Sequence, residues 1–501
     1  MGTKETKKWW ILGALSFALL AVGLDMTVLN VALPTLATSL NASTSQLQWF
    51  ADSYNLVLAA LLLPAGMLGD RYGRKKMLLI ALLVFGAGSI GCANSDSPEM
   101  LISMRVFLGL GAAFLLPLSI SVLPVFFHGE ERSRAMMIWA ITNMLGIPLG
   151  PIVGGWLLKH FEWGSVFWIN IPFVVIGLVA ISFLMPENSS KISSKIDYLG
   201  IFTSSIGLTM VTYAVIRAGE KGWSDASVII LLIVGVVILG IFTIWQRYTK
   251  HPLIDLSLFR SASFTWGSIL ATLVSFAMFG LLFAIPQFFQ AVKGYDTFGT
   301  GLRLLPMIAG LMVGAKISDQ LSKRIGSKNN VAIGFLVLAI GLGIGAWTDL
   351  ESGYWFAALW ITISGIGLGL SLPNSMDAAL AELSAERSGI GSALIMALRQ
   401  VGGTIGVAIL GTVINSSYRH HLNMKGLPST VTEKVEQSVS AGVVIAKQLK
   451  FNRLLDSVQK AFIHGMDMML IGCSGIAIIG CLLAFLFLPH KQHGAKKANK
   501  A

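Results

Sequence analysis

Long apolar runs constrain this chain more than any other feature. Stretches of about 20 mostly apolar residues, the length a helix needs to cross a bilayer, recur along the sequence and are separated by polar turns. Only 12% of the residues are charged, against roughly 25% in ordinary soluble domains. We therefore predict an all-α membrane protein with 14 transmembrane helices. The predicted spans are 9–33, 46–69, 77–94, 99–126, 135–159, 164–186, 198–217, 226–247, 263–291, 299–321, 329–348, 354–377, 389–415 and 463–488.

The distribution of Lys and Arg supports this count. With the N-terminus inside, basic clusters fall in the loops assigned to the cytoplasm, as the positive-inside rule expects. The short external loops contain only Lys159, Arg217, Lys221 and Lys293. A miscount by one helix would scramble this alternation, so we predict that both termini are cytoplasmic. The net charge of +12 then belongs to loops beside a lipid bilayer, and we expect no nucleic acid partner.

A weak internal repeat predicts the domain organisation. Leu, Arg, Gly and Lys recur at matching positions in residues 68–75 and 321–328, eight predicted helices apart. Two pseudo-symmetric six-helix bundles with two inserted helices would produce this spacing. The predicted parts are an N-terminal bundle (1–187), a linker with the inserted helices (188–262), a C-terminal bundle (263–490) and a basic cytoplasmic tail (491–501). The C-terminal bundle includes a long external loop, 416–462, which is either an ordered hairpin or a solvated linker.

Three charged residues lie within predicted spans of the first bundle. A carboxylate at the centre of a membrane helix costs about 2.5–3.5 kcal/mol on insertion scales, so Asp25 is a candidate functional residue. Arg105 needs an anion or a group of carbonyls, and Asp25 is its best candidate partner. Asp52 is expected at a similar depth, since each acid lies a few turns from the outer end of its helix. Burial favours the protonated acid whereas a nearby guanidinium favours the carboxylate, so these residues are predicted to couple to protons. The alternative is a structural ion pair.

Two motifs have compositions that are typical of segments involved in conformational change. In residues 66–76, glycines allow close helix approach and Asp70 can pair with arginines and helix ends, which predicts a conformational latch. In residues 146–155, two prolines and four glycines predict a bent packing surface in the membrane. The alternatives are a basic anchor and a plain packing face. The candidate residues are Gly66, Asp70, Arg71, Gly73, Arg74, Gly146, Pro148, Gly150, Pro151, Gly154 and Gly155.

The second bundle supplies candidate substrate contacts. Aromatic residues surround three candidates in the sequence, Gln287, Gln290 and Met307. A cavity lined in this way suits flat, hydrophobic ligands. Arg399 places a cation inside the predicted span 389–415, where a structural role is as reasonable as a substrate role. Asp377, at the end of the preceding span, is expected to be a plain interfacial charge.

Together these motifs resemble the major facilitator superfamily, in its fourteen-helix drug:proton antiporter branch. Residues 24–34 are similar to the helix 1 motif of that branch, 66–76 to the superfamily loop motif, 105–113 to the helix 4 motif and 146–155 to the antiporter motif of helix 5. The stretch 49–54 and the long loop are similar to the QacA-type quaternary-ammonium exporters. The resemblance implies that Asp25, Asn30 and Tyr54 contact substrate. That subgroup has acidic residues in helix 13, and 393–400 contains none, which suggests monocationic, zwitterionic or neutral drugs.

The resulting hypothesis is a proton-coupled antiporter in a bacterial cell membrane. It would export amphipathic, often cationic drugs and biocides as a monomer, with drugs and protons as its partners. One alternative is a dedicated exporter of a single antibiotic or metabolite. A membrane enzyme is disfavoured because the sequence has no zinc-protease motif, nucleophile elbow or P-loop. We expect no metal and no cofactor. Cys92, Cys473 and Cys481 lack metal-ligand spacing and are predicted to be packed thiols.

Overall fold

The computed structural model of the chain describes residues 2–186, 196–381, 383, 388–424, 432, 435–436 and 439–489. No β-strand occurs in these described ranges. Residues 187–195, where the predicted linker begins, and the predicted tail 491–501 lie outside them. The helices are α1 (Gly2–Ser39), α2 (Thr44–Tyr72), α3 (Arg74–Ala93), α4 (Pro98–Phe126), α5 (Glu130–His160), α6 (Ser165–Trp168), α7 (Asn170–Leu184), α8 (Tyr198–Lys221), α9 (Ala226–Tyr248), η1 (Leu256–Arg260), α10 (Ala262–Gln287), η2 (Phe288–Val292), α11 (Thr297–Gly345), α12 (Tyr354–Leu380), α13 (Ser388–His421), α15 (Val439–Gln448) and α16 (Asn452–Phe487).

Twelve helices within the described residues are long and apolar enough to cross a membrane. Helix α11 has 49 residues and covers two predicted spans, which meet at a kink where Gly326 has a φ of 81°. Helix α5 covers the predicted span 135–159 but is not one of the twelve. The all-helical class is therefore confirmed, whereas the count of 14 spans stays a prediction.

The internal repeat has a counterpart in the backbone. Gly73 separates α2 from α3 and has a φ of 96°, and Gly326 interrupts α11 with a φ of 81°. These two glycines occupy matching positions in residues 68–75 and 321–328. Positive φ values are strained for residues with a Cβ, so the repeated glycine marks the same sharp turn twice.

Polar caps start several helices where the apolar runs begin. Ser43 accepts a hydrogen bond from the Gln46 backbone amide, and Gln46 accepts one in return, which forms a capping box before α2. Asp225 caps α9 and Asp296 caps α11, each by accepting a backbone amide hydrogen bond with its carboxylate. These caps position the ends of the long helices.

The chain divides into two compact units. Unit 1 comprises 1–217, 223–269 and 373–401, and unit 2 comprises 218–222, 270–372 and 402–501. Helices α10, α12 and α13 therefore contribute segments to both. The four domains predicted from the sequence stay a prediction.

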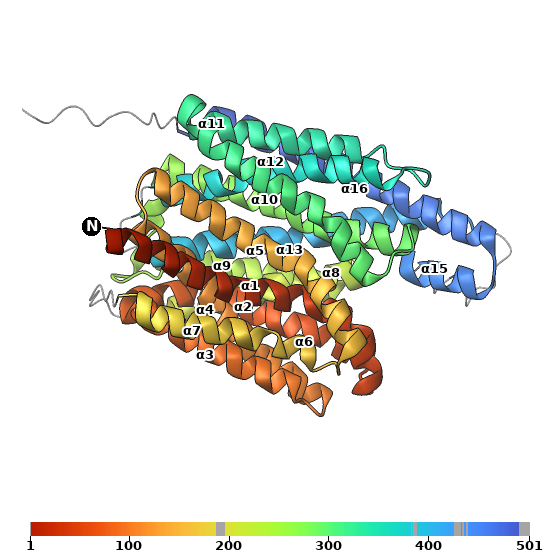
Figure 1. Cartoon of the computed structure of the whole chain (residues 1–501), viewed down its shortest axis with the longest axis horizontal. Coiled ribbons are helices and arrows are strands. Elements are labelled where there is room, and N and C mark those ends of the chain that lie inside the picture. The colour runs from red at the N-terminus through yellow and green to blue at the C-terminus, as the bar shows by residue number, and fades with distance from the viewer. Residues whose placement is uncertain are drawn as a thin grey trace, which may run out of the picture. The chain divides into compact units, whose positions relative to one another are not determined.

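Glycines set the packing inside unit 1. Helix α1 packs along α5, and α2 and α3 both pack along α4 (Figure 1). A Cβ on Gly111 of α4 would lie 2.7 Å from the Phe85 backbone of α3. A Cβ on Gly109 would lie 2.8 Å from the Tyr54 carbonyl of α2. Such close approach is typical of membrane helices, whose interfaces are rich in small residues.

Glycines also allow close helix packing in unit 2. In this unit α11 packs along α16 (Figure 1). A Cβ on Gly310 or Gly314 of α11 would collide with the α12 carbonyls of Thr362 and Ile366. Helix α10 contains Pro286 near its end and continues into the π-helix η2, whose Phe288 and Phe289 are buried. A π-turn beside a proline is one known way for a helix to accommodate a lost hydrogen bond.

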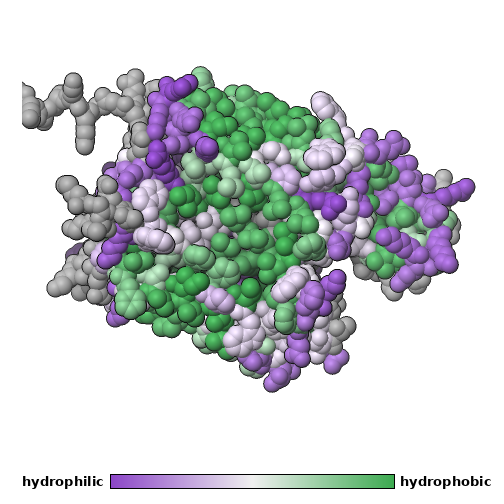
Figure 2. All heavy atoms as spheres, in the orientation of Figure 1, coloured by the Kyte–Doolittle hydropathy of each residue, from purple (hydrophilic) through white to green (hydrophobic). Residues whose placement is uncertain are grey.

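The described part of the long loop is helical. Helix α15 packs on α16 and buries Val439 and Val443. The Tyr418 hydroxyl donates a 2.9 Å hydrogen bond to the Val435 carbonyl. Figure 2 shows hydrophilic residues over α15 and the adjacent end of α16, in contrast to the hydrophobic surfaces of the long helices. The two alternatives for 416–462 as a whole, an ordered hairpin or a solvated linker, stay predictions.

Candidate functional site

The acid in α1 forms a buried ion pair in unit 1. Arg105 Nη1 lies 2.5 Å from Asp25 Oδ2, and the two residues are 2% and 0% exposed. A buried charge is stable only when it is paired and hydrogen-bonded. The contact expected between these two residues is therefore present, while its role in proton coupling stays a prediction.

Helix α2 completes the environment of the guanidinium. Arg105 Nε donates a 2.8 Å hydrogen bond to the Phe50 carbonyl. The guanidinium carbon lies 4.5 Å from the centre of the Tyr54 ring, a cation–π contact. The Tyr54 hydroxyl is buried, and no described residue hydrogen-bonds to it. Tyr54, expected to contact substrate, thus supports Arg105 with its ring.

The other carboxylate oxygen of Asp25 faces a polar group that the sequence reasoning missed. Asn170 Nδ2 lies 3.4 Å from Asp25 Oδ1 and 3.1 Å from Ser89 Oγ. Ser89 in turn donates a 2.8 Å hydrogen bond to the Phe167 carbonyl. Both Asn170 and Ser89 are fully buried. The signal that could have identified Asn170 is the one used for Asp25, a polar side chain inside an apolar run.

A glycine seam lies beside the ion pair, where α1 meets α5. A Cβ on Gly146 would lie 2.5 Å from the Gly23 carbonyl carbon, and one on Gly154 would lie 2.6 Å from a Val28 methyl. The Thr27 hydroxyl donates to the Gly146 carbonyl at 3.1 Å. These α1 residues bracket Asp25, so any movement along the seam moves the acid.

The remaining residues of the helix 5 motif are less directly involved. Gly150 approaches Thr27, so a Cβ there would collide with the threonine side chain. Pro151 and Gly155 are half-buried. The side chain of Pro148 lies outside the described residues.

The second motif joins Asp70 to the start of α13. Asp70 Oδ1 accepts hydrogen bonds from Arg74 at 2.7 and 3.2 Å, and Oδ2 accepts one from the Ile390 backbone amide at 3.0 Å. Asp70 is 3% exposed, and a Cβ on Gly389 would collide with its carboxylate. An anion at a helix N-terminus satisfies free amides and interacts well with the helix dipole.

The other residues of this loop motif shape the contact. A Cβ on Gly66 would lie 2.5 Å from both the Gly389 carbonyl oxygen and the Ala393 side chain of α13. Gly73 provides the turn between α2 and α3. Arg71 is half-buried and lies 5.6 Å from the Tyr72 ring centre. The loop and α13 are thus held together within unit 1.

Two further basic residues make contacts in unit 1. Arg132 at the start of α5 pairs with Asp377 of α12 at 2.6 Å. Arg399 is 8% exposed, lies 3.5 Å from the Met376 sulfur and 5.9 Å from the centre of the Trp139 ring. Asp377 is therefore an ion-pair partner, and Arg399 has soft, polarizable neighbours.

The remaining predicted substrate residues are distributed over both units. In unit 1, Asn30 is exposed and Asp52 is half-buried. In unit 2, Gln290 is exposed, and Gln287 donates a 3.0 Å hydrogen bond to the Phe283 carbonyl. Met307 is fully buried against α12. The substrate roles of these residues stay predictions.

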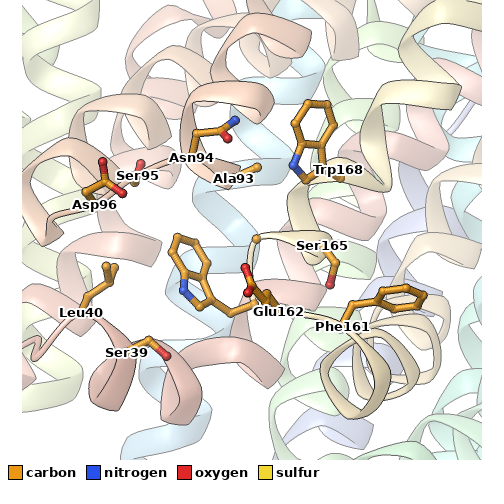
Figure 3. Close-up of a pocket in the computed structure, with 12 residues that line it drawn as sticks. Ser39, Leu40, Ala93, Asn94, Ser95, Asp96, Phe161, Glu162, Ser165 and Trp168 are labelled. Carbon is orange, nitrogen blue, oxygen red and sulfur yellow. The ribbon is translucent and has the colours of Figure 1, made fainter.

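Unit 1 contains a cavity of about 820 Å³ between the loops that follow α1, α3 and α5. Figure 3 shows Asn94, Ser95 and Asp96 on one side of it and Phe161 and Glu162 on another. We call it the loop pocket. It has acidic and aromatic walls, and α6 forms part of its lining.

A smaller cavity, about 360 Å³, lies in unit 2 between the α11–α12 loop and α16. Its lining includes Asp349, Lys460, His464 and Asp467, and one Asp467 oxygen is buried without a hydrogen bond. Hydrogen bonds from Ser352 hold the pKa of Asp349 below its ordinary value. The sequence reasoning did not single out Asp467.

No group of three or more His, Cys, Asp or Glu side chains suited to a metal ion is found among the described residues. Cys92 and Cys473 are buried free thiols, and Cys481 is a half-buried one. Long apolar helices that enclose a buried ion pair define a multi-pass membrane protein of the transporter class.

The family model of the Major Facilitator Superfamily matches residues 15–407. The chain belongs to this superfamily and is a transporter, not an enzyme. The family predicted from the motifs is therefore confirmed.

Relatives cover almost the whole chain. It is 33% identical to the multidrug efflux pump LfrA of Mycolicibacterium smegmatis over 92% of each chain. It is 28% identical to the tetracenomycin C resistance and export protein of Streptomyces glaucescens, over 95% of this chain and 91% of the relative. The crystal structure of the human organic anion transporter MFSD10 shares its fold, with a TM-score of 0.61 at 14% identity, over 95% of this chain and 99% of that one.

Proposed function

We propose that this protein is a proton-coupled antiporter that exports amphipathic, often cationic drugs and biocides from the cytoplasm by alternating access. The observation that carries the proposal is the Asp25–Arg105 pair, buried inside two apolar helices beside the glycine seam. A carboxylate in this setting holds or releases a proton as its contact with the guanidinium or with water changes. The similarity to the multidrug pump LfrA supports drugs as the transported class.

The coupling follows from competition at one carboxylate. When Arg105 moves or water enters, Asp25 takes a proton, and loss of that proton restores the ion pair. An inward proton releases about 2.3 kcal/mol per 100 mV of membrane potential, before any pH gradient. We propose that drug and proton occupy the site in alternation, so that this energy drives export. In this account Asp52 assists as a second acid.

The proposal includes a membrane topology. Helix α11 is counted as two spans and α5 as one, as the sequence predicts. The resulting fourteen spans place both termini in the cytoplasm. Two six-helix bundles would rock while the two inserted helices stay peripheral. Helix α9 supports the peripheral position, because Ile230, Ile233 and Val236 are each 59% exposed. The location would be the cell membrane of a bacterium.

Dye transport tests the proposal. Everted vesicles with an acidic interior should accumulate ethidium when they contain the wild type, and Asp25→Asn should abolish accumulation driven by the gradient. Asp96→Asn is the matched control, since it makes the same change at an exposed carboxylate. Accumulation by Asp25→Asn at the wild-type rate would refute the role of Asp25.

A second candidate function is export of one antibiotic only. It is favoured by the similarity to the tetracenomycin C export protein. A panel of dyes, biocides and antibiotics separates the two functions, because a specialist would move one compound and a multidrug exporter many.

A further inference from the structure

Asn170 contacts Oδ1 of Asp25, the carboxylate oxygen to which Arg105 does not donate. It is the first residue of α7 and is 0% exposed. Its Nδ2 group donates to Asp25 Oδ1 at 3.4 Å and to Ser89 Oγ at 3.1 Å. Its own oxygen, Oδ1, is buried and has no hydrogen-bond partner among the residues that the structure describes. The amide therefore offers the carboxylate a donor and keeps an acceptor unused beside it.

The charged and titratable groups around Asp25 come from three helices. Arg105 of α4 donates to the opposite oxygen, Oδ2. Tyr54 of α2 and Cys92 of α3 lie within electrostatic reach of the pair. Among the described residues, Asn170 is thus the neutral group that hydrogen-bonds the acid, while Arg105 is the cation.

An amide fits both protonation states of a carboxyl group. A carboxylate only accepts hydrogen bonds, whereas a protonated acid also donates one. Rotation of the Asn170 amide by half a turn would exchange Nδ2 and Oδ1, so that Oδ1 accepts from the protonated acid. The Ser89 hydroxyl, which now donates to the Phe167 carbonyl, can turn its hydrogen to the same oxygen.

We propose that Asn170 is a positioning residue that holds Asp25 in both its charged and its protonated state, with Ser89 as the partner that permits the amide to turn. The inference rests on the proposed function, in which Asp25 carries the proton. The contacts that support it are the Nδ2 hydrogen bonds to Asp25 and Ser89 and the buried position of all three side chains.

The hydrogen-bonded chain extends to the wall of the loop pocket. Phe167, which accepts from Ser89, belongs to α6, and the α6 residues Ser165 and Trp168 line that pocket (Figure 3). The Asn170 amide therefore connects Asp25 to α6, which lines the loop pocket. A change in the position of α6 would reach Asp25 through the side chains of Ser89 and Asn170.

The pH profile of transport tests the role of Asn170. Asn170→Leu removes the donor and the acceptor at nearly constant size, while Asn170→Ser keeps one of each in its hydroxyl. Without the donor the charged acid loses more than the neutral one, so the midpoint of the profile should move up by roughly one pH unit in Asn170→Leu. It should move less in Asn170→Ser. A structural role would lower the amount of folded protein and leave the midpoint in place.

The experiment uses the full-length protein in everted vesicles, with ethidium as the probe. An unchanged midpoint in folded Asn170→Leu would overturn the inference. If that variant does not fold, Asn170→Ser and Ser89→Ala decide: an upward shift in Asn170→Ser or a downward shift in Ser89→Ala supports it, because Ser89 assists the protonated acid, and unchanged midpoints in both overturn it. Asp25→Asn separates the two proposals, because gradient-driven export by that variant would refute the proposed function itself.

Discussion

Replacing Arg105 by methionine should expose how strongly the ion pair holds unit 1 together. The substitution keeps a long side chain but removes the guanidinium, which contacts Asp25, the Phe50 carbonyl and the Tyr54 ring. Asp25 is 0% exposed and would keep only the Asn170 amide as a hydrogen-bond donor. The variant therefore leaves a buried carboxylate without its cation.

The expected loss of stability is about 3–5 kcal/mol, the usual cost of removing one partner from a buried pair. Separate contacts give a similar figure. A charge-assisted hydrogen bond contributes about 1.5–3 kcal/mol and a desolvated cation–π contact about 2 kcal/mol. The loss of stability should be smaller at acidic pH, because the unpaired Asp25 carboxyl is then protonated in the folded variant and carries no buried charge. Stability of the variant should thus fall as the pH rises.

Unfolding in detergent can be followed with a thiol-reactive dye. Cys92 and Cys473 are buried free thiols that react only on unfolding, and Cys481→Ser removes the half-buried third. SDS titrations of the wild type, Arg105→Met, Asp25→Asn and the double variant form a double-mutant cycle. The double variant should lose less stability than the two single variants together.

Two results would refute this reasoning. One is a loss below about 1 kcal/mol for Arg105→Met at pH 8, which is the range of an exposed pair. The other is strict additivity in the cycle, which would mean that Asp25 and Arg105 do not stabilise each other.

Substitutions at Tyr54, Asp70 and Gly146, with Gly13 as a control position, test the other contacts. Tyr54→Phe should leave stability and transport almost unchanged, because the hydroxyl has no hydrogen-bond partner among the described residues. Tyr54→Leu should lower the stability by about 2 kcal/mol in the same SDS assay, because it removes the ring that faces Arg105. Equal losses in the two variants would contradict the cation–π contact. Asp70→Asn should weaken the cap on α13 by about 1.5–3 kcal/mol and slow ethidium export, and wild-type export would argue against a latch. Gly146→Ala should cost about 1–3 kcal/mol through overpacking, while Gly13→Ala, which has open space around it, should cost nothing measurable; equal effects of the two would rule out the seam.

The sequence predicted features that depend on composition and on local pattern. The apolar runs located the long helices, because a bilayer imposes their length. The motifs identified the superfamily, which the family model confirms. The pairing of Asp25 with Arg105 was also foreseeable, since a cation and an acid within one apolar bundle have few other partners.

Contacts that depend on helix rotation were not predictable in this way. Asn170 and Ser89 face Asp25 only because α7 and α3 present those particular sides to α1. The neighbours of Arg399 include thioethers and an indole, which carry no charge signal in the sequence. Asp467 lies in an apolar run like Asp25, but its cavity becomes apparent only when the α11–α12 loop is placed beside α16.

Proton movement caused by the substrate tests the central claim most directly. Proteoliposomes with a pH-sensitive dye inside would receive ethidium without any imposed gradient. We expect the wild type to move protons against the direction of the dye, Asp25→Asn to move none and Asp96→Asn to behave as the wild type. Proton movement of wild-type size in Asp25→Asn would contradict the claim that the carboxylate paired with Arg105 carries the coupled proton.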